Sequence, residues 1–199
     1  MRKLIVSEFM SLDGVMQAPG GADEDTDGGF TQGGWTWPYW PDDIGAHFFQ
    51  AMSECDTFLL GRKTWQGHAV FETMAEGDPF GDVMKAKQKY VVSTTLQSTD
   101  AWRNSTIIRD NVIEAVRKLK QQEGQNIYVD GSSMLIHALA QHNLIDEYSL
   151  LVYPLVLGSG KCVFPEGLRI NLQLIETKPF PTGVVLMRYV VKSDEADAS

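Results

Sequence analysis

The chain has 199 residues, which is enough for one domain with a sizeable hydrophobic core or for two small ones. Its 43% apolar and 22% charged residues are typical of a globular protein, and no apolar run approaches the roughly 20 residues of a membrane helix, so we expect no membrane span. The net charge of −9 argues against non-specific nucleic-acid binding, which needs a basic surface, but it allows a local site for phosphate.

The cysteine and histidine spacings predict no metal site. Cys55 and Cys162 lie far apart and match neither a metal motif nor a CxxC pair, so we expect cytosolic thiols that are buried and not catalytic. The four histidines are scattered without ligand spacing. The basic and apolar stretch 1–6 is cut off by Ser7 and Glu8, which leaves it far too short for the core of a signal peptide. We therefore expect a cytoplasmic protein.

Strand and helix patterns alternate along most of the chain. Apolar and β-branched runs predict strands at 3–10, 57–60, 89–92, 107–108, 127–129, 147–154, 170–177 and 183–192. Helices are predicted from Asp42 or Asp43 onward, from Arg62 onward, over 111–122 and over 133–142. This order predicts an α/β fold with a mostly parallel sheet that ends in antiparallel C-terminal strands. We expect residues 1–192 to form one domain and the acidic residues 193–199 to form a flexible tail.

Residues 17–43 form one long segment without helix or strand periodicity, here called the aromatic segment. Loops of this length in a compact domain are usually functional or disordered. Four aromatic side chains argue against disorder throughout, because they have apolar surface to bury: Trp35, Trp37, Tyr39 and Trp40. The segment is either a lid over a ligand or a surface for a partner, and the sequence favours neither. In the helix that follows, we expect the buried face to carry Ile44, Phe48, Phe49 and Met52.

Three strands end in turns that are rich in glycine, hydroxyl or basic residues. These turns are 61–64 (GRKT), 93–94 (ST) and 131–133 (GSS). Each one alone could be an ordinary turn. Cations in the first turn of a helix, as at Arg62 and Lys63, oppose the helix dipole unless an anion binds there. Because ligands of such sheets bind at the carboxyl ends of the strands, the three turns together predict a phosphate-binding site at one edge.

Two acidic residues near the N-terminus have open roles. Asp13 precedes Gly14, and Asp-Gly is a strong turn signal, so Asp13 is either a turn residue or a functional one. Glu8 is an acid within an apolar strand, and it either faces solvent or points into a pocket.

Several short motifs occur in order along the chain. They are SLDG at 11–14, LGRKTW at 60–65, VSTT at 92–95, VDGS at 129–132, LIDE at 144–147 and PLVLGSG at 154–160. Together they resemble the dihydrofolate-reductase-like family, in particular the branch similar to the reductase domain of the bifunctional riboflavin-biosynthesis deaminase-reductase. The resemblance covers residues 3 to about 191. Its most specific mark is the Asp146-Glu147 pair followed by the run 154–160.

The resemblance implies a three-layer dihydrofolate-reductase-like fold and an NADPH-dependent reductase. It implies hydride transfer to a small heterocyclic substrate, either a pyrimidine of the riboflavin pathway or a pterin, by a homodimer. The cofactor-binding residues that it implies are Gly14, Gly61, Arg62, Lys63, Thr64, Ser93, Thr94, Gly131, Ser132, Ser133 and Met134. It places Asp13 beside the nicotinamide as the candidate catalytic residue. The implied substrate-binding residues are Val6, Ser7 and Phe49.

One position departs from the folate reductases proper, which carry a carboxylate early in the first helix. A gap-free alignment through Phe49 and Gly61 puts Gly45 at that position, and Asp43 lies two residues earlier. The riboflavin-type branch characteristically lacks that acid, so the resemblance points away from folate reduction. Hydride transfer needs the cofactor oriented against an electrophilic carbon and requires no protein nucleophile. The sequence also leaves open a non-catalytic nucleotide-binding or scaffold protein, with the aromatic segment as a dimer contact.

Overall fold

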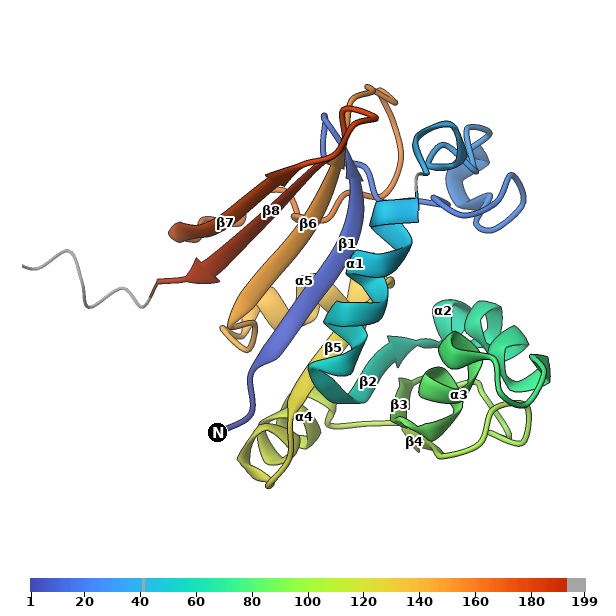
Figure 1. Ribbon diagram of the computed structural model, residues 1–199. Helices are drawn as coiled ribbons and strands as arrows, with labels where there is room; N and C mark the ends of the chain where they lie inside the picture. Colours follow the sequence, from blue (N-terminus) through green and yellow to red (C-terminus); the bar gives the residue numbers. More distant parts are fainter. Residues whose placement is uncertain (41, 193–199) are drawn as a thin grey trace, which may run out of the picture.

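The computed structural model describes residues 1–40 and 42–192 (Figure 1). Its strands form one 8-stranded sheet with the order β4-β3-β2-β5-β1-β6-β8-β7. The strands are β1 (Leu4–Ser11), β2 (Cys55–Gly61), β3 (Gln88–Val92), β4 (Ser105–Ile108), β5 (Asn126–Asp130), β6 (Glu147–Tyr153), β7 (Leu172–Pro179) and β8 (Val185–Val191). The flexible tail predicted for residues 193–199 lies outside the described residues.

Most neighbouring strands run parallel, as the sequence predicted. β1 lies between β5 and β6 and is parallel to both, and β2, β3 and β4 continue the parallel part. The C-terminal strands β8 and β7 are antiparallel to their neighbours. Strands of a parallel sheet are covered on both faces, which explains why β1 is mostly apolar. Its sequence, LIVSEFMS, includes the buried polar residues Ser7 and Glu8.

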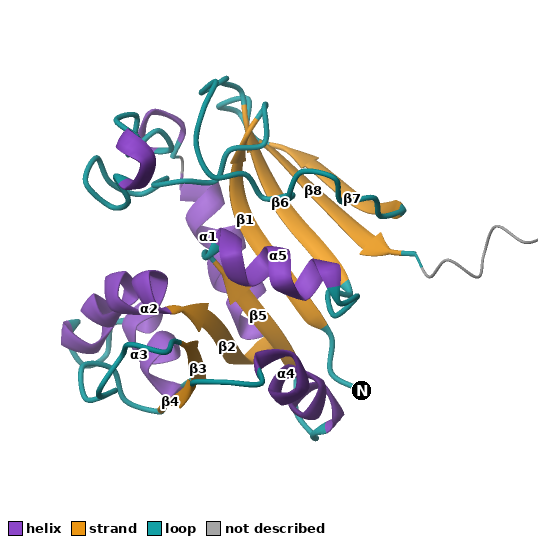
Figure 2. Cartoon of the chain, turned by 180° about the vertical axis from the view of Figure 1, so that it is seen from behind, coloured by secondary structure: helices purple, strands orange, loops and turns teal. Residues whose placement is uncertain are grey.

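Helices cover both faces of the sheet (Figures 1 and 2). The α-helices of the described residues are α1 (Asp42–Ser53), α2 (Arg62–His68), α3 (Pro79–Ala86), α4 (Val112–Gln121) and α5 (Ser133–Gln141). On the face of α1, α2 and α3, one hydrophobic core contains Phe58 and Trp65. On the face of α4 and α5, a second core contains Val116 and Ile136. The fold is therefore the three-layer α/β arrangement that was expected. None of these helices, within the described ranges, combines the length and apolar character needed to cross a lipid bilayer.

The prediction for the buried face of the first helix was partly wrong. Ile44, Phe48 and Met52 are buried, as expected. Phe49 was expected to face the core as well, but 41% of its surface is exposed. The three buried residues follow one another at i, i+4 and i+8, whereas Phe49 lies about 100° further round the helix. The apolar stripe of α1 is thus narrower than the sequence suggested.

Helix α3 was not predicted, although its start signal is present in the sequence. The Asp78 carboxylate accepts a hydrogen bond from the Gly81 N–H at 2.7 Å, and Pro79 follows as the first helical residue. The helix has only 8 residues. That is too short a window for a helical periodicity to stand out from a turn.

Ion pairs join the three strands β6, β8 and β7 on the face that α1 shares. Glu147 of β6 is 1% exposed and accepts hydrogen bonds from Arg188 of β8, at 2.8 Å from Nε and 2.5 Å from Nη2. The same guanidinium donates to Glu176 of β7 at 2.9 Å. A buried carboxylate is tolerated only with such a partner, so Arg188 makes the burial of Glu147 possible.

β7 is one of the two edge strands of the sheet, and most of its length is exposed. Its apolar residues Leu174 and Ile175 are 48% and 47% exposed. An unpaired edge strand of this kind can pair with another chain. The homodimer implied by the resemblance stays a prediction.

Removal of the Arg188 guanidinium is expected to destabilise the fold strongly. In Arg188→Met, the one ion pair left to Glu147 among the described residues is the weak contact with Lys3, whose Nζ lies 3.8 Å away and whose side chain is largely exposed. Breaking a buried ion pair from one side typically costs about 3–5 kcal/mol. Urea unfolding followed by tryptophan fluorescence measures the loss. The control is Lys178→Met, on the neighbouring strand and without an ion pair among the described residues, which should change the free energy of unfolding by less than about 0.5 kcal/mol. Equal losses in the two variants would contradict this account.

Candidate functional site

The carboxyl ends of β2 and β5 approach each other so closely that glycine is required on both sides. A Cβ at Gly61 would overlap the Ser132 side chain, and a Cβ at Gly131 would lie 2.5 Å from Thr64 Oγ1. Gly131 also has a φ of +69°, a conformation that side chains rarely adopt. These four residues, here called the strand-end site, were all predicted to bind the cofactor. The structure brings them together at the edge of the sheet where α/β proteins bind their ligands.

The helix that follows β5 has an N-terminus suited to an anion. Ser132, the residue before α5, has a φ of +71°, which is strained for a residue other than glycine, and no side chain of the described ranges caps the helix. The first N–H groups of a helix have no partner within the helix itself. Ser133 is buried at this helix start, whereas the Met134 side chain is 82% exposed. If Met134 binds a cofactor, its backbone is the part that does so.

Lys63 does not point to an open phosphate site, because the aromatic segment already binds it. Its ammonium lies 2.9 Å from Asp25 and 2.6 Å from Asp27. Lys161 binds the same two carboxylates, at 2.5 Å and 2.8 Å. These four residues, here called the latch, tie the segment to α2 and to the loop before β7. The segment is ordered here by charge as well as by aromatic packing.

The latch shifts the ionisation of its members. Hydrogen bonds from Lys161 and Lys63 lower the pKa of Asp27 to about 2. Burial alone would raise the pKa of Asp25, but the same two lysines outweigh it and lower the pKa. The pKa of Lys63 is raised by its hydrogen bonds to Asp27 and Asp25. The latch therefore stays charged throughout the neutral range.

Arg62, the other cation predicted to hold phosphate, is not held by a carboxylate among the described residues. Its Nη1 donates to Gln66 at 3.0 Å, and it forms no ion pair within the part of the chain that the structure describes. It stands at the start of α2, directly after Gly61 of the strand-end site. It is the cation of this site that is able to meet a phosphate without first losing a carboxylate.

A set of titratable groups surrounds the strand-end site. Glu8, whose placement the sequence could not decide, is 5% exposed and accepts a hydrogen bond from the Gly131 N–H at 2.7 Å. Asp130 lies 2.8 Å from His68 Nε2. Burial would lower the pKa of His68, but the hydrogen bond and charge of Asp130 raise it above its usual value. Glu24 of the aromatic segment adds its negative charge near Glu8.

Asp13 and Gly14, predicted beside the nicotinamide, build the turn after β1. The Asp13 carboxylate accepts hydrogen bonds from Ser11 Oγ at 2.6 Å, from the Leu157 N–H at 3.1 Å and from the Gly158 N–H at 2.7 Å. The Ser11 hydroxyl lowers the pKa of Asp13, and the two N–H groups act in the same direction. Asp13 thus remains ionised and holds the 154–160 run in place. A catalytic role for it stays a prediction.

In the turn at residues 93–94, the Ser93 hydroxyl is bound by neighbouring backbone N–H groups. Ser93 Oγ accepts hydrogen bonds from the Thr95 N–H at 3.1 Å and the Leu96 N–H at 2.9 Å. Thr94 is exposed beside it at the carboxyl end of β3. Their binding of the adenosine ribose phosphate stays a prediction.

Aromatic side chains fill the space between the end of β1, the end of β6 and the start of α1. Phe9 contacts Phe48 with ring centroids 4.9 Å apart and Tyr153 with centroids 5.8 Å apart. Trp40 stacks on Phe48 at an interplanar angle of 14° and is 41% exposed. Trp35 is buried against Tyr153, with centroids 5.2 Å apart. The aromatic segment therefore covers this end of the sheet, and Phe9 and Tyr153 are members of the cluster that the sequence reasoning missed.

The Tyr153 hydroxyl has no hydrogen-bond partner among the residues that the structure describes, although the residue is 0% exposed. An unsatisfied buried hydroxyl typically costs about 1–3 kcal/mol. Such a cost is common where a ligand or ordered water completes the site. The ring that carries this hydroxyl packs against Phe9, Trp35 and Tyr39.

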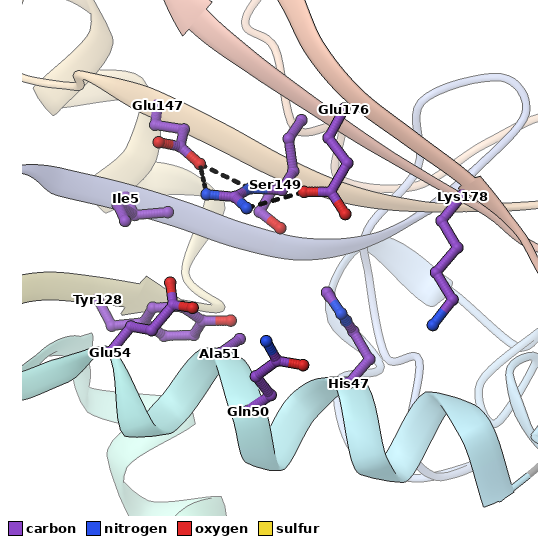
Figure 3. A pocket seen from close by; sticks show the side chains of 11 residues that line it. Ile5, His47, Gln50, Ala51, Glu54, Tyr128, Glu147, Ser149, Glu176 and Lys178 are labelled. Carbon is purple, nitrogen blue, oxygen red and sulfur yellow. Dashed lines mark hydrogen bonds and ion pairs between the residues drawn. The ribbon is translucent and has the colours of Figure 1, made fainter.

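A hollow lies between α1 and the strands β6, β8 and β7 (Figure 3). It encloses about 600 Å³ of space open to solvent. The side chains of His47 and Gln50 from α1 face Lys178 and Glu176 across it (Figure 3). Ser149 and Ile5 form its floor. Its walls mix acids and cations, in contrast to the aromatic cluster at the ends of β1 and β6.

The predicted substrate-binding residues do not gather in one place. Val6 is 0% exposed and belongs to the core on the face of α4 and α5, so its side chain is directed away from α1. This orientation contradicts the expectation that Val6 lines the substrate pocket. Ser7 is buried next to Tyr128, and Phe49 is exposed on α1. Alternation along β1 explains the result, because successive side chains point to opposite faces.

The strand-end site offers hydrogen-bond donors of the kind that the predicted nucleotide cofactor needs. The glycine-lined strand ends, the uncapped start of α5 and the hydroxyls of Thr64 and Ser132 are the groups that bind pyrophosphate in α/β proteins. Arg62 supplies a cation. Within residues 1–40 and 42–192, no group of three or more His, Cys, Asp or Glu side chains is arranged to hold a metal ion.

Comparisons with known proteins agree with this picture of the fold. Residues 2–186 match the family model described as the RibD C-terminal domain. The uncharacterized protein YyaP of Bacillus subtilis is 31% identical over 194 residues, which is 94% of each chain. The crystal structure of a Shewanella protein whose name assigns it to riboflavin biosynthesis superimposes with a TM-score of 0.74 at 19% identity, covering 96% of this chain and 99% of that one.

A folate reductase also matches over nearly its whole length. Dihydrofolate reductase from Enterococcus faecalis, in a complex that includes NADP(H), superimposes with a TM-score of 0.61 at 13% identity. The match covers 96% of this chain and 97% of that one. At such low identities the two solved structures show the fold, which is dihydrofolate-reductase-like. The family follows from the model match and from the relative in Bacillus subtilis: the chain belongs to the RibD C-terminal domain family.

Proposed function

We propose that the protein is an NADPH-dependent reductase that transfers a hydride to a small planar heterocycle. The observation that carries this proposal is the close approach of the β2 and β5 ends, where Gly61 and Gly131 leave no room for a side chain. Such a junction exposes backbone N–H groups to a bound pyrophosphate. The Enterococcus faecalis enzyme of the same fold carries NADP(H).

The cofactor would be held mainly by backbone groups and by one cation. The N–H groups at the start of α5 and the hydroxyls of Thr64 and Ser132 would bind the pyrophosphate. Arg62 would meet the 2′-phosphate, because it has no carboxylate partner among the described residues. When bound, the cofactor supplies the hydride. This chain supplies orientation, exclusion of water and a proton.

The substrate would bind where the aromatic segment now packs. Phe9, Phe48 and Tyr153 offer faces and edges to a planar ring, and Trp40, which stacks on Phe48, is already partly exposed. The buried hydroxyl of Tyr153 would find its missing partner in a ring nitrogen or carbonyl. Pyrimidines of the riboflavin pathway and pterins are the classes that we propose to test first.

The alternative is a protein that kept the fold without turnover. The latch favours it, since Lys63 is bound by carboxylates of the same chain and not free for phosphate. A scaffold protein separates from the reductase at the first step, cofactor binding, whereas a non-catalytic nucleotide-binding protein would bind the cofactor without oxidising it. Titration of NADPH and NADH, followed by tryptophan fluorescence, tests this step. We expect saturable binding of NADPH with the higher affinity, and an absence of binding by either nucleotide would overturn the reductase.

Arg62→Ala should weaken NADPH binding by about tenfold or more, and NADH binding by less. Hydrogen bonds to charged groups contribute about 1.5–3 kcal/mol, and NADH lacks the 2′-phosphate. Isothermal titration calorimetry gives both dissociation constants. The matched control is Arg117→Ala on α4, which removes an exposed guanidinium far from the strand ends. Equal losses of NADPH and NADH affinity would show that Arg62 does not recognise the 2′-phosphate.

Opening the latch should strengthen NADPH binding. In the double variant Asp25→Asn/Asp27→Asn, the carboxylates no longer compete with phosphate for Lys63, so we expect the dissociation constant to fall several-fold. The control is Asp23→Asn, in the same segment and without an ion pair among the described residues. Circular dichroism and tryptophan fluorescence confirm that the variants stay folded. An unchanged or higher dissociation constant for the double variant would show that Lys63 does not reach the cofactor.

A further inference from the structure

The hollow between α1 and the strands β6, β8 and β7 presents polar side chains that lack partners among the described residues (Figure 3). Ser149 forms part of its floor and is 6% exposed, and its hydroxyl makes no hydrogen bond within the described ranges. Lys178 of β7 and His47 of α1 face each other across the hollow, and neither forms an ion pair or a hydrogen bond with a described residue. Polar groups without partners in a concave site are groups that a ligand or ordered water can satisfy.

The acids on the strands of this hollow are already bound by a cation. Glu147 accepts two hydrogen bonds from Arg188, and Glu176 accepts one. The third acid of the lining, Glu54, is on α1 and stands seven positions after His47. Seven residues of helix correspond to about 10 Å along its axis. The acid without an ion pair among the described residues therefore lies at the end of the hollow opposite the histidine.

The other end of the hollow is basic and adjoins the aromatic cluster. This basic end consists of His47 and Lys178. The His47 ring lies 6.3 Å from the ring of Phe180 and 6.3 Å from that of Phe48, measured between centroids. Lys178 Nζ lies 5.1 Å from the centroid of the same Phe180 ring, which is buried and so holds both basic side chains near one another. Since Phe48 also carries the stacked Trp40, the basic end is next to the space proposed for the substrate ring.

The two side chains of the basic end disfavour each other's positive charge. Burial, followed by the charge of Lys178, lowers the pKa of His47 below its usual value. Arg188 acts in the same direction, whereas Glu176 and Glu54 act against it. An anion bound between Lys178 and His47 would offset this repulsion and stabilise the imidazolium. Binding of an anion and protonation of His47 should therefore favour each other.

We propose that the basic end binds an oxyanion group of the substrate, a phosphate or a carboxylate, while the ring of the same molecule packs against the aromatic cluster. Lys178 supplies the charge, and protonated His47 and the Ser149 hydroxyl supply hydrogen bonds. Ile5 of the hollow and Phe9 of the cluster lie on the same face of β1, about 13 Å apart along the strand. This length fits a heterocycle with an extended anionic substituent. The proposal rests on the proposed function and names its substrate class.

Anion binding can be measured without substrate or cofactor. Sulfate is the probe, because it stays doubly charged over the pH range in which histidine titrates. We expect sulfate, but not chloride at equal ionic strength, to raise the pKa of His47 in an NMR titration of the imidazole C–H protons, with His47→Gln to assign the resonance. The affinity for sulfate should increase as pH falls. An equal pKa of His47 in the two salts would overturn the proposal, whatever else the protein binds.

Two lysine variants locate the effect. Lys178→Met should raise the pKa of His47 in chloride, because a repelling charge is lost, and should remove the further rise in sulfate. Lys118→Met is the matched control, since it removes an exposed lysine of α4 and should keep the wild-type response. A sulfate effect that persists in Lys178→Met would place the anion elsewhere and overturn the site.

Competition identifies the source of the oxyanion. Ribose 5-phosphate presents a phosphate, and glutamate presents carboxylates. We expect one of them to displace sulfate from His47 at the lower concentration, and that one names the group. Displacement by neither would overturn an oxyanion on an organic substrate.

Kinetics connect the site to the proposed reaction. The substrate pairs are dihydrofolate against dihydropterin, and the phosphorylated pyrimidine of the riboflavin pathway against its dephosphorylated form. For the member with the anionic group, Lys178→Met should raise KM about tenfold and leave kcat and the dissociation constant of NADPH within about twofold. KM for the other member should not change, and Lys178→Arg should restore most of the affinity.

The outcomes separate this proposal from the proposed function. Equal KM values in the wild type and Lys178→Met for the anionic substrate would overturn the role of the basic end in substrate binding. Failure of the wild type to bind NADPH would instead overturn the reductase and leave the sulfate result standing.

Discussion

The close approach of β2 and β5 at their carboxyl ends is the constraint on which the rest of the site depends. Gly61 lies against Ser132, and Gly131 lies against Thr64. These contacts fix where α2 and α5 begin, and they hold the Gly131 N–H beside the Glu8 carboxyl on β1. A methyl group at either glycine would push the two strand ends apart. The parallel pairing of β1, β2 and β5 transmits this arrangement to the whole edge of the sheet.

Charge around this edge is balanced within the chain. Asp25 and Asp27 of the aromatic segment bind Lys63, where a cofactor phosphate was expected, and Glu8 occupies the N–H of Gly131. The protein's own carboxylates thus take positions suited to phosphate oxygens. Trp35 of the aromatic segment packs against Tyr153 and fills the space next to this edge of the sheet with the chain's own side chains. The structure therefore represents a closed arrangement, in which binding of the proposed dinucleotide would require exchange of internal contacts for external ones.

Much of the fold could be predicted because its signals are local. Apolar runs marked the strands, and their alternation with helices indicated the parallel sheet. The errors have physical causes. Phe49 looked like a core residue by type, but its angle around α1 turns it to solvent. Val6 was assigned to a pocket by resemblance, but strand alternation directs it into the core opposite α1. Helix α3 was too short for its periodicity to show.

The three polar strand ends could be located from the sequence alone, since glycine and hydroxyl residues after apolar runs are local features. It could not decide which charges meet. Glu8 could have faced solvent, and Lys63 could have been free, because both outcomes depend on residues far away in the chain. Only the tertiary structure brought Glu8 to Gly131, which is 123 residues distant, and Lys63 to Asp25, which is 38 residues distant. Burial and electrostatic interaction depend on distance in space, and the fold alone sets that distance.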